Sequence, residues 1–341
     1  MLSIPLFSAP HGVQRIVEVQ LAWLRPWARH TIRIVGTLGA LAWIAHRLDA
    51  NSLLAAVSAL PAWAFLVPAS VVLINTLNQA IRLAWVLRHL GHRVPVRTVL
   101  SCLMRGAFVG LTLPAGGGEI AKTALLGRVG PGLRTAVSAV VVVRITQLPS
   151  WVLVLCWGLA VGAYAAVPVL MVAAMSFIAI ATALLTVVAL GRLPWRKGWP
   201  WSGTVDRWRD GVSTIRKEPA LILSLIGLGI LAAVLNSAVV WVLLTASGTP
   251  IPFATVLGLI PAADVLIWLP VSVGGVGVRE SVFALALEPW GILAPSAVAI
   301  GIVRWTGELA RGAIGCMLMA LGEGRAGLTF NADPKGEVRD E

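Results

Sequence analysis

The chain has 341 residues, of which 58% are hydrophobic and 12% are charged. This composition excludes an ordinary soluble globular protein, in which about a quarter of the residues are charged. The formal net charge of +12 comes from basic residues gathered between apolar stretches, which favours a membrane orientation signal over nucleic-acid binding. We therefore predict a polytopic α-helical membrane protein with no nucleic-acid partner.

The first part of the chain alternates apolar stretches with basic segments. Residues 1–30 lack the apolar core and cleavage site of a secretory signal, so we predict a cytoplasmic arm. Apolar stretches at about 31–47 and 62–87 are long enough to cross a hydrocarbon core of about 30 Å. The second leads into the basic segment 88–97, and a further span is predicted at 133–160.

An interrupted segment lies between these spans. The apolar stretch 98–113 breaks at the sequence Pro-Ala-Gly-Gly-Gly, residues 114–118, and a short helix is predicted over 119–126. Glycine permits a tight turn. Backbone that leaves its helix at membrane depth is tolerated only inside protein or beside a water-filled cavity.

The rest of the chain repeats this alternation. Its predicted apolar stretches lie at 167–190, 220–246, 253–269 and 294–320. Residues 191–219 form a basic cytoplasmic loop with seven Arg or Lys against three Asp or Glu. The run before the last span breaks at Leu-Pro-Val-Ser-Val-Gly-Gly-Val-Gly-Val-Arg-Glu, residues 269–280. The polar tail 323–341 is predicted to be disordered.

The basic segments favour two re-entrant hairpins. If 98–126 and 253–288 crossed the membrane, basic loops would fall on both of its faces. If each returns to its own side, every strongly basic loop lies on one face, as the positive-inside rule requires. We therefore predict an all-α transmembrane bundle over 31–322, with about six full spans and two broken, re-entrant hairpins. It would lie in the cell inner membrane with both termini in the cytoplasm.

The two hairpins resemble each other. The first reads LPAGGGE (113–119) and the second LPVSVGGVGVRE (269–280). Arg144 lies 25 residues after the Glu of the first motif, and Arg304 lies 24 after that of the second. Because the hairpins enter from opposite sides, we predict an inverted repeat, which marks the binding site in many transporters. The alternative is a chance match of two short motifs.

The glycine breaks and the charges beside them form the predicted substrate site. Helix N-terminal amides at such breaks favour anions, so a phosphodiester head group would suit them. The breaks consist of Pro114, Gly116, Gly117, Gly118, Pro270, Gly274, Gly275 and Gly277. The candidate substrate-binding residues are Glu119, Lys122, Arg144, Arg279, Glu280, Arg304 and Glu308.

These charges also have a purely structural interpretation. A charge at the bilayer centre costs roughly 2.5–3.5 kcal/mol on insertion scales, so it should be paired and face inward. Glu119 with Lys122, and Arg304 with Glu308, have the spacing of ion pairs on one helical face. Charge beside both glycine breaks favours a substrate path over internal ion pairing alone.

Other polar residues in the apolar stretches have separate roles. Asp264 is either a proton-coupling carboxylate or a partner of Arg279 or Arg304. Arg82 and Arg105 lie near the predicted cytoplasmic interface, where long basic side chains reach the head groups. Hydrogen bonds between helices are predicted for Asn75, Asn78 and Gln79. The sequence has no nucleotide-binding loop, metal-ligand cluster or Ser/His/Asp set, so we expect neither an enzyme nor a cofactor or metal.

The later motif, LPVSVGGVGVRES at 269–281, resembles the signature of the lysylphosphatidylglycerol synthase transmembrane-region family of flippase-like membrane proteins. LPAGGGE at 113–119 resembles a weaker motif of that family, and the resemblance covers roughly 30–320. In larger members this domain is fused to a soluble aminoacyltransferase, and the membrane part is thought to move the lipid between leaflets. Because the chain after Glu323 is too short for that enzyme, the resemblance implies membrane transport and leaves the lipid open.

We therefore expect a lipid flippase that moves a polar or anionic lipid between leaflets through a polar cavity at mid-membrane. One alternative is an accessory membrane subunit that presents lipid to a separate glycosyl- or aminoacyltransferase. The other is a secondary transporter of a small solute. The expected partners are a membrane lipid and, in the accessory role, a lipid-biosynthetic enzyme.

Overall fold

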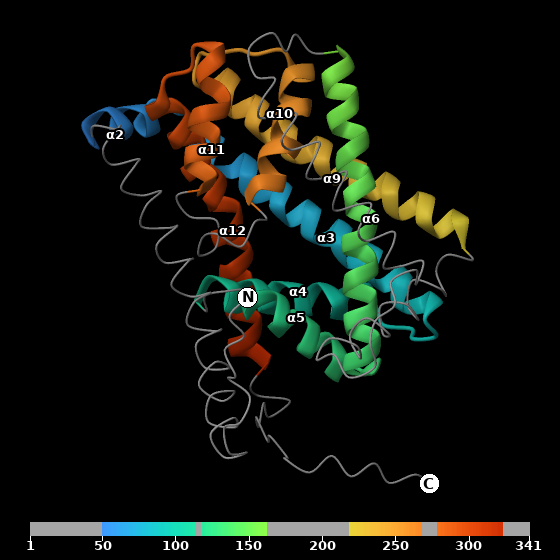
Figure 1. Cartoon of the computed structure of the whole chain (residues 1–341). Coiled ribbons are helices and arrows are strands. Elements are labelled where there is room, and N and C mark those ends of the chain that lie inside the picture. Colours follow the sequence, from blue (N-terminus) through green and yellow to red (C-terminus); the bar gives the residue numbers. More distant parts are fainter. Residues whose placement is uncertain (1–49, 113–116, 162–217, 268–277, 323–341) are drawn as a thin grey trace, which may run out of the picture.

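The computed structural model describes residues 50–112, 117–161, 218–267 and 278–322. Every regular element in these residues is a helix (Figure 1). In chain order they are α2 (Ala50–Ser58), η1 (Ala62–Phe65), α3 (Leu66–His89), α4 (Val96–Thr112), α5 (Gly117–Arg128), α6 (Gly132–Val161), α9 (Pro219–Ala246), α10 (Phe253–Ile267), α11 (Val278–Leu287), η2 (Glu288–Trp290) and α12 (Ala294–Gly322). The predicted all-helical class is confirmed for this part of the chain.

Membrane-crossing length and apolarity identify three spans in the described residues. They are 62–89, 132–158 and 219–246, and they match three of the predicted spans. The helix α12 has the bounds of the predicted last span but carries Arg304, Glu308 and Arg311, and it is not among the three. The predicted segments 1–30, 31–47, 167–190 and 323–341 lie outside the described residues, as does 191–219 except for its last two residues. The protein is thus a membrane protein, and the predicted total of six spans includes segments beyond those described.

Each predicted hairpin consists of two helices. The helices α4 and α5 contact each other at the lower end of the molecule in Figure 1, and α10 and α11 contact each other at the upper end. The breaks that join them, 113–116 and 268–277, lie outside the described residues. These breaks contain Pro114, Gly116, Pro270, Gly274, Gly275 and Gly277, whereas Gly117 and Gly118 are the first residues of α5.

Glycines allow α4 and α5 to approach closely. A Cβ on Gly118 would lie 2.8 Å from both the carbonyl oxygen of Gly106 and the Cα of Gly110. A Cβ on Gly106 would lie 2.5 Å from the Cβ of Lys122. Small residues permit this kind of backbone contact between membrane helices. The root of the Lys122 side chain is therefore held against α4.

The described helices form two halves that pack in the same way. The helices α3 and α9 pass through the centre side by side in opposite directions, and α6 and α12 also run in opposite directions (Figure 1). In the first half, α4 and α3 both pack on α12, the last helix of the second half. In the second half, α10 and α9 both pack on α6, the last helix of the first half. Each half therefore places the first helix of its short pair against the long last helix of the other half, and the second helix, α5 or α11, against the last helix of its own half.

Asparagines join the two central helices. Asn75 Nδ2 of α3 donates to Asn236 Oδ1 of α9 over 3.0 Å, and Asn78 Nδ2 donates to the Leu228 carbonyl over 2.8 Å. The predicted interhelical hydrogen bonds are confirmed for these two asparagines, whereas Gln79 forms none with the described residues. Asn75 and Asn236 are 161 residues apart. The same interval separates two backbone hydrogen-bond acceptors, Phe65 and Ile226.

Hydroxyl groups bond two backbone carbonyls that are separated by the same interval. Thr306 Oγ1 of α12 donates to the Phe65 carbonyl at the start of α3 over 2.9 Å. Ser150 Oγ of α6 donates to the Ile226 carbonyl of α9 over 3.0 Å. The two acceptors are 161 residues apart (226 − 65). The α12–α3 and α6–α9 contacts thus share the interval at their acceptors, whereas the donors are 156 residues apart (306 − 150).

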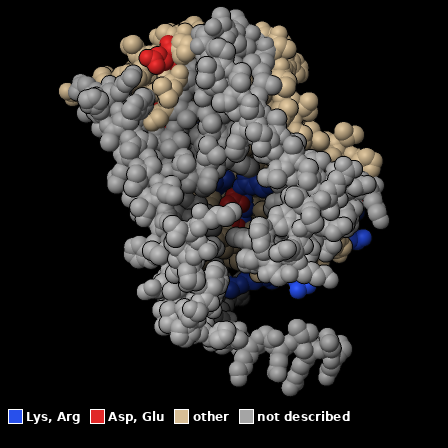
Figure 2. All heavy atoms as spheres, in the orientation of Figure 1, with Lys and Arg blue, Asp and Glu red and all other residues tan. Residues whose placement is uncertain are grey.

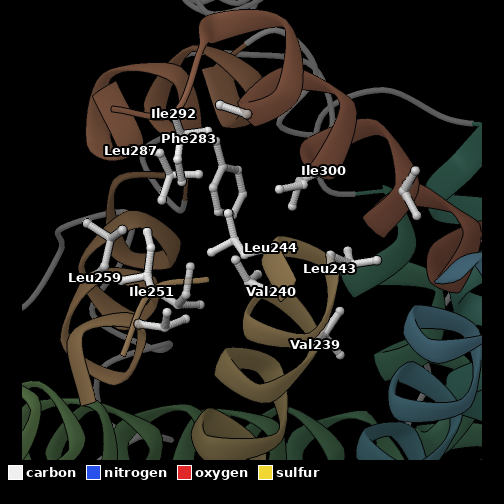
Figure 3. Packing of buried hydrophobic residues seen from close by; sticks show 14 of the residues in the cluster. Val239, Val240, Leu243, Leu244, Ile251, Leu259, Phe283, Leu287, Ile292 and Ile300 are labelled. Carbon is white, nitrogen blue, oxygen red and sulfur yellow. The ribbon is translucent and has the colours of Figure 1, made fainter. Parts of the chain in front are cut away.

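A large apolar core lies where α9, α10, α11 and α12 meet (Figure 3). Phe283 of α11 is fully buried and points towards Leu244 of α9, beside Leu287 and Ile292. Leu259 of α10 belongs to the same cluster. Burial of apolar side chains is the main source of packing stability in such a core. This core fixes the rotation of α11, and with it the carboxylate one turn before Phe283.

Candidate functional site

Ionisable side chains of α5 and α6 meet beside the first glycine break. Glu119, in the first turn of α5, contacts the Lys122 Nζ over 2.5 Å and also forms an ion pair with Arg144 of α6. Arg144 lies at the middle of the span 132–158. The predicted pair of Glu119 and Lys122 is therefore present, and Arg144 joins it to form a triad.

The three side chains of this triad differ in exposure. The Lys122 side chain is 9% exposed, whereas those of Glu119 and Arg144 are 49% and 36% exposed. Lys122 is buried because its root lies against Gly106 of α4. Glu119 and Arg144 are consequently the two members that a ligand can reach.

Arg82 of α3 is buried, and the prediction that it reaches the head groups is wrong. The residue is 3% exposed. Its guanidinium donates to the side-chain oxygen of Gln147 and, over 3.2 Å each, to the Val143 carbonyl and the Thr146 hydroxyl. Gln147 in turn donates to the Gly229 carbonyl of α9 over 3.3 Å. The side chain turns inward because one face of α6 offers it three acceptors.

The charged pair on α12 also differs from the sequence expectation. Glu308 forms its described ion pair with Arg311, three residues later, and both side chains are partly exposed. Arg304 instead places its guanidinium over the Phe283 ring, 5.3 Å from the ring centre. Arg311 is a site residue that the sequence analysis missed. The signal that could have found it is the i, i+3 spacing within an otherwise apolar helix.

A close seam between α4 and α12 brings Arg311 near the triad. A Cβ on Gly315 would lie 2.0 Å from the Met104 carbonyl oxygen, so the two backbones touch. Arg105 donates to the Leu318 carbonyl over 2.9 Å across the same seam. Arg105 therefore links two helices in this structure.

These residues form one group, which we call the charge cluster. Its members are Arg82, Glu119, Lys122, Arg144, Glu308 and Arg311. Arg144 and Arg311 are both close enough to Lys122 to interact with it electrostatically, and Arg144 likewise interacts with Arg82. With every group ionised, four cations and two carboxylates give the cluster a formal charge of 4 − 2 = +2. Figure 2 shows basic and acidic atoms beside one another near the middle of the face drawn there.

The second half places a carboxylate at the corresponding position. Glu280, in the first turn of α11, is 5% exposed and accepts a hydrogen bond from Trp305 Nε1 over 3.1 Å. Glu280 and Trp305 are 25 residues apart, as are Glu119 and Arg144. One partner of Glu280 is thus Trp305, the residue after Arg304.

Two further predicted site residues lie on described helices, but the structure does not describe their side chains. Arg279 is in the first turn of α11 and Asp264 lies in α10. Within the described ranges, no group of three His, Cys, Asp or Glu side chains is arranged to hold a metal ion. The structure therefore brings the predicted residues together in two places, the charge cluster and the surroundings of Glu280.

Comparison with known proteins identifies the family. The sequence model of the family described as "Lysylphosphatidylglycerol synthase TM region" matches residues 31–305. No curated protein and no solved structure matches the chain. The matched region contains the triad and Glu280, whereas Glu308 and Arg311 follow it. The chain belongs to the lysylphosphatidylglycerol synthase transmembrane-region family.

Proposed function

We propose that the protein is a lipid translocase that moves a polar or anionic lipid between the leaflets of the cell inner membrane. The observation that carries this proposal is the charge cluster beside the middle of the span 132–158. Ionisable groups at that depth are costly and typically mark a substrate or ion path. Family membership supports a lipid-related membrane role.

The half-exposed members of the triad would meet the lipid head group. Arg144 would bind a phosphate, for which a guanidinium offers several donors in a fixed plane. Glu119 would hold Arg144 and Lys122 in the absence of lipid and would accept hydrogen bonds from hydroxyl or ammonium groups in its presence. The acyl chains would remain in the surrounding bilayer throughout.

An inverted repeat would supply the movement. The recurring 161-residue interval, the antiparallel course of α3 and α9, and the matching packing of both halves support a two-fold relation in the membrane plane. In transporters built this way, the two halves rock around a shared site. We propose that 98–126 and 253–288 are re-entrant hairpins that face each other across this site, with both termini in the cytoplasm.

The second half would line the other end of the path. Glu280, Arg279 and Arg304 are its proposed contacts with substrate, and Asp264 is the candidate carboxylate for coupling to protons. Translocation on this account is passive or ion-coupled and needs neither a cofactor nor catalytic chemistry by this chain.

The test is lipid exchange by the purified protein in liposomes. Fluorescent phosphatidylglycerol in the outer leaflet is quenched by dithionite, and the rate at which protected lipid becomes reachable gives the exchange rate. We expect wild-type protein to speed exchange and Arg144→Gln to remove most of that gain. Arg134→Gln is the matched control, because Arg134 is an exposed residue of the same helix.

The other outcomes separate the alternatives. Lipid binding without exchange for any lipid tested would contradict the translocase and favour a subunit that presents lipid to a separate transferase. Uptake of a soluble solute without lipid exchange would favour a secondary transporter. Exchange that is fast in wild type and unchanged in Arg144→Gln would remove the triad from the proposed path.

A further inference from the structure

Arg82 is a buried cation whose partners are all neutral. It lies within the span 62–89 and is 3% exposed. Its guanidinium donates to an amide oxygen, a backbone carbonyl and a hydroxyl group, and its Nε is buried without an acceptor. Within the described part of the chain no carboxylate contacts it. Burying a charge without a counter-charge is expensive, so such a residue demands a reason.

The carboxylates of the charge cluster are engaged with other cations. Glu119 pairs with Lys122 and Arg144, and Glu308 pairs with Arg311. Arg82 is the fourth cation, and the formal excess of +2 includes its charge. At low local dielectric an excess charge acts over longer distances than it does in water. An anion that approaches the partly exposed Arg144 would therefore be stabilised by it.

Burial prevents Arg82 from touching a ligand, so its effect must pass through Arg144. The two guanidinium groups interact electrostatically, and like charges repel. Three acceptors on α6 hold Arg82 in place, whereas the Arg144 side chain is partly exposed and pairs with Glu119. The buried charge consequently raises the positive potential at Arg144, the cation that a ligand can reach.

We propose that Arg82 is a positioning residue that, through Arg144, restricts the site to lipids whose phosphodiester head group carries net negative charge. This inference rests on the proposed function, since it names the substrate class of that site. A zwitterionic head group brings its own cation into the same positive field, so it is disfavoured. Phosphatidylglycerol is the probe for the first class and phosphatidylcholine for the second.

Gln147→Glu is the most informative substitution. Gln147 is a direct hydrogen-bond acceptor of Arg82, and glutamate has nearly the same shape with a negative charge. It would supply the missing counter-charge and change little volume. We expect the ratio of phosphatidylglycerol to phosphatidylcholine exchange rates to fall about tenfold, equivalent to about 1.4 kcal/mol. Arg82→Gln should lower the ratio similarly, and Arg82→Lys, which keeps the charge, should retain most of it.

Controls exclude a general structural effect. Arg134→Gln removes an exposed charge from α6 and should leave the ratio unchanged. Thermal unfolding in detergent must show that Gln147→Glu is as stable as wild type. If Arg82→Gln does not fold, the ratio of exchange rates in Gln147→Glu still tests the proposal. An unchanged ratio in a folded Gln147→Glu protein would overturn the proposal.

Equilibrium binding separates this inference from the proposed function. Binding of the two lipids to protein in detergent is measured without any transport. If wild type exchanges both lipids equally and binds them equally, the translocase stands and the selectivity proposal fails. If wild type exchanges neither lipid, the translocase fails, and the binding preference alone supports or overturns the role of Arg82. The proposal would also be overturned if inorganic phosphate displaced bound phosphatidylglycerol as effectively as phosphatidylglycerol itself does. The ligand would then be a soluble anion.

Discussion

The two halves of the molecule place the same carboxylate in different surroundings. Glu119 begins α5 and lies between two cations, whereas Glu280 begins α11 and accepts a hydrogen bond from an indole. The positions of Lys122 and Arg144 in the first half are taken by Phe283 and Trp305 in the second (283 − 122 and 305 − 144 both equal 161). The first carboxylate is half-exposed between two cations, and the second is buried beside aromatic rings.

If the two halves are the inverted repeat that we propose, this difference shows how one framework can serve two purposes. The Phe65 and Ile226 carbonyls, which are 161 residues apart, each accept a hydrogen bond from a hydroxyl of a neighbouring long helix. The side chains around the two carboxylates differ. On our account the first half offers charge to a head group, and the second forms a packed end that must open for the lipid to leave.

The largest expected effect comes from replacing the carboxylate of the first half. The same substitution in the second half serves as the comparison. Glu119→Gln leaves Lys122 buried without its carboxylate, so we expect lipid exchange to fall at least about tenfold and stability to fall by roughly 2 kcal/mol. That loss is below the roughly 3–5 kcal/mol typical of a broken buried pair, because Glu119 is half-exposed.

Glu280→Gln is the counterpart. Glutamine keeps an acceptor for Trp305, so stability should change by less than about 1 kcal/mol. Thermal unfolding in detergent and exchange in liposomes measure both variants. If Glu119→Gln and Glu280→Gln lost equal stability, that result would contradict the different surroundings that we assign to the two carboxylates.

The next prediction concerns glycines in two helix contacts that are alike in the two halves, α6–α9 and α12–α3. A Cβ on Gly229 would lie 2.2 Å from the Ser150 Oγ, and one on Gly307 would lie 2.5 Å from the Val72 Cγ2. We expect Gly229→Ala and Gly307→Ala each to destabilise the protein by about 1–3 kcal/mol through overpacking.

Gly227→Ala is the control for this pair of substitutions. No atom lies within 4 Å of a Cβ at Gly227, which is on the same helix as Gly229. Its midpoint of thermal unfolding should match or slightly exceed that of wild type, since alanine favours a helix more than glycine does. A Gly307→Ala protein as stable as this control would mean that the two seams are not equivalent.

A smaller effect is expected at the indole. Trp305→Phe removes the hydrogen bond to Glu280 but keeps an aromatic ring in place. We expect a loss of about 1.5 kcal/mol in unfolding free energy, typical of a bond to a charged acceptor, and less than a threefold change in exchange rate. A tenfold loss of exchange without loss of stability would place Trp305 in the substrate path.

The smallest expected effect on stability is that of the hydrogen bond between Asn75 and Asn236, which joins the two central helices. A double-mutant cycle with Asn75→Ala and Asn236→Ala should give a coupling free energy of about 0.6 kcal/mol, the average for side-chain hydrogen bonds between membrane helices. Asn78→Ala combined with Asn236→Ala is the control cycle, because Asn78 bonds a backbone carbonyl and not Asn236. Equal coupling in both cycles would contradict a specific contact.

The sequence predicts the helices well because their limits depend on local chemistry. The span predicted at 133–160 is observed as Gly132–Val161, since glycines flank a long run in which Arg144 is the one formal charge after Arg134. The short helix after the first break is found over Gly117–Arg128 for the same reason. Pairs close in sequence, such as Glu119 and Lys122, are also predictable from helical spacing.

Contacts that depend on the rotation of one helix against another are not predictable in this way. Arg82 turns inward because its acceptors lie on α6, more than 60 residues away (143 − 82 = 61). Glu308 has a basic residue both four before and three after it, and packing decides in favour of Arg311. Arg304 is instead positioned by the core that holds Phe283.

The most direct test of the account is the exchange of labelled phosphatidylglycerol in liposomes that contain wild-type protein, Arg144→Gln or Arg134→Gln. The account predicts fast exchange with wild type and Arg134→Gln, and exchange near that of protein-free vesicles with Arg144→Gln. Wild-type exchange no faster than in protein-free vesicles would contradict it.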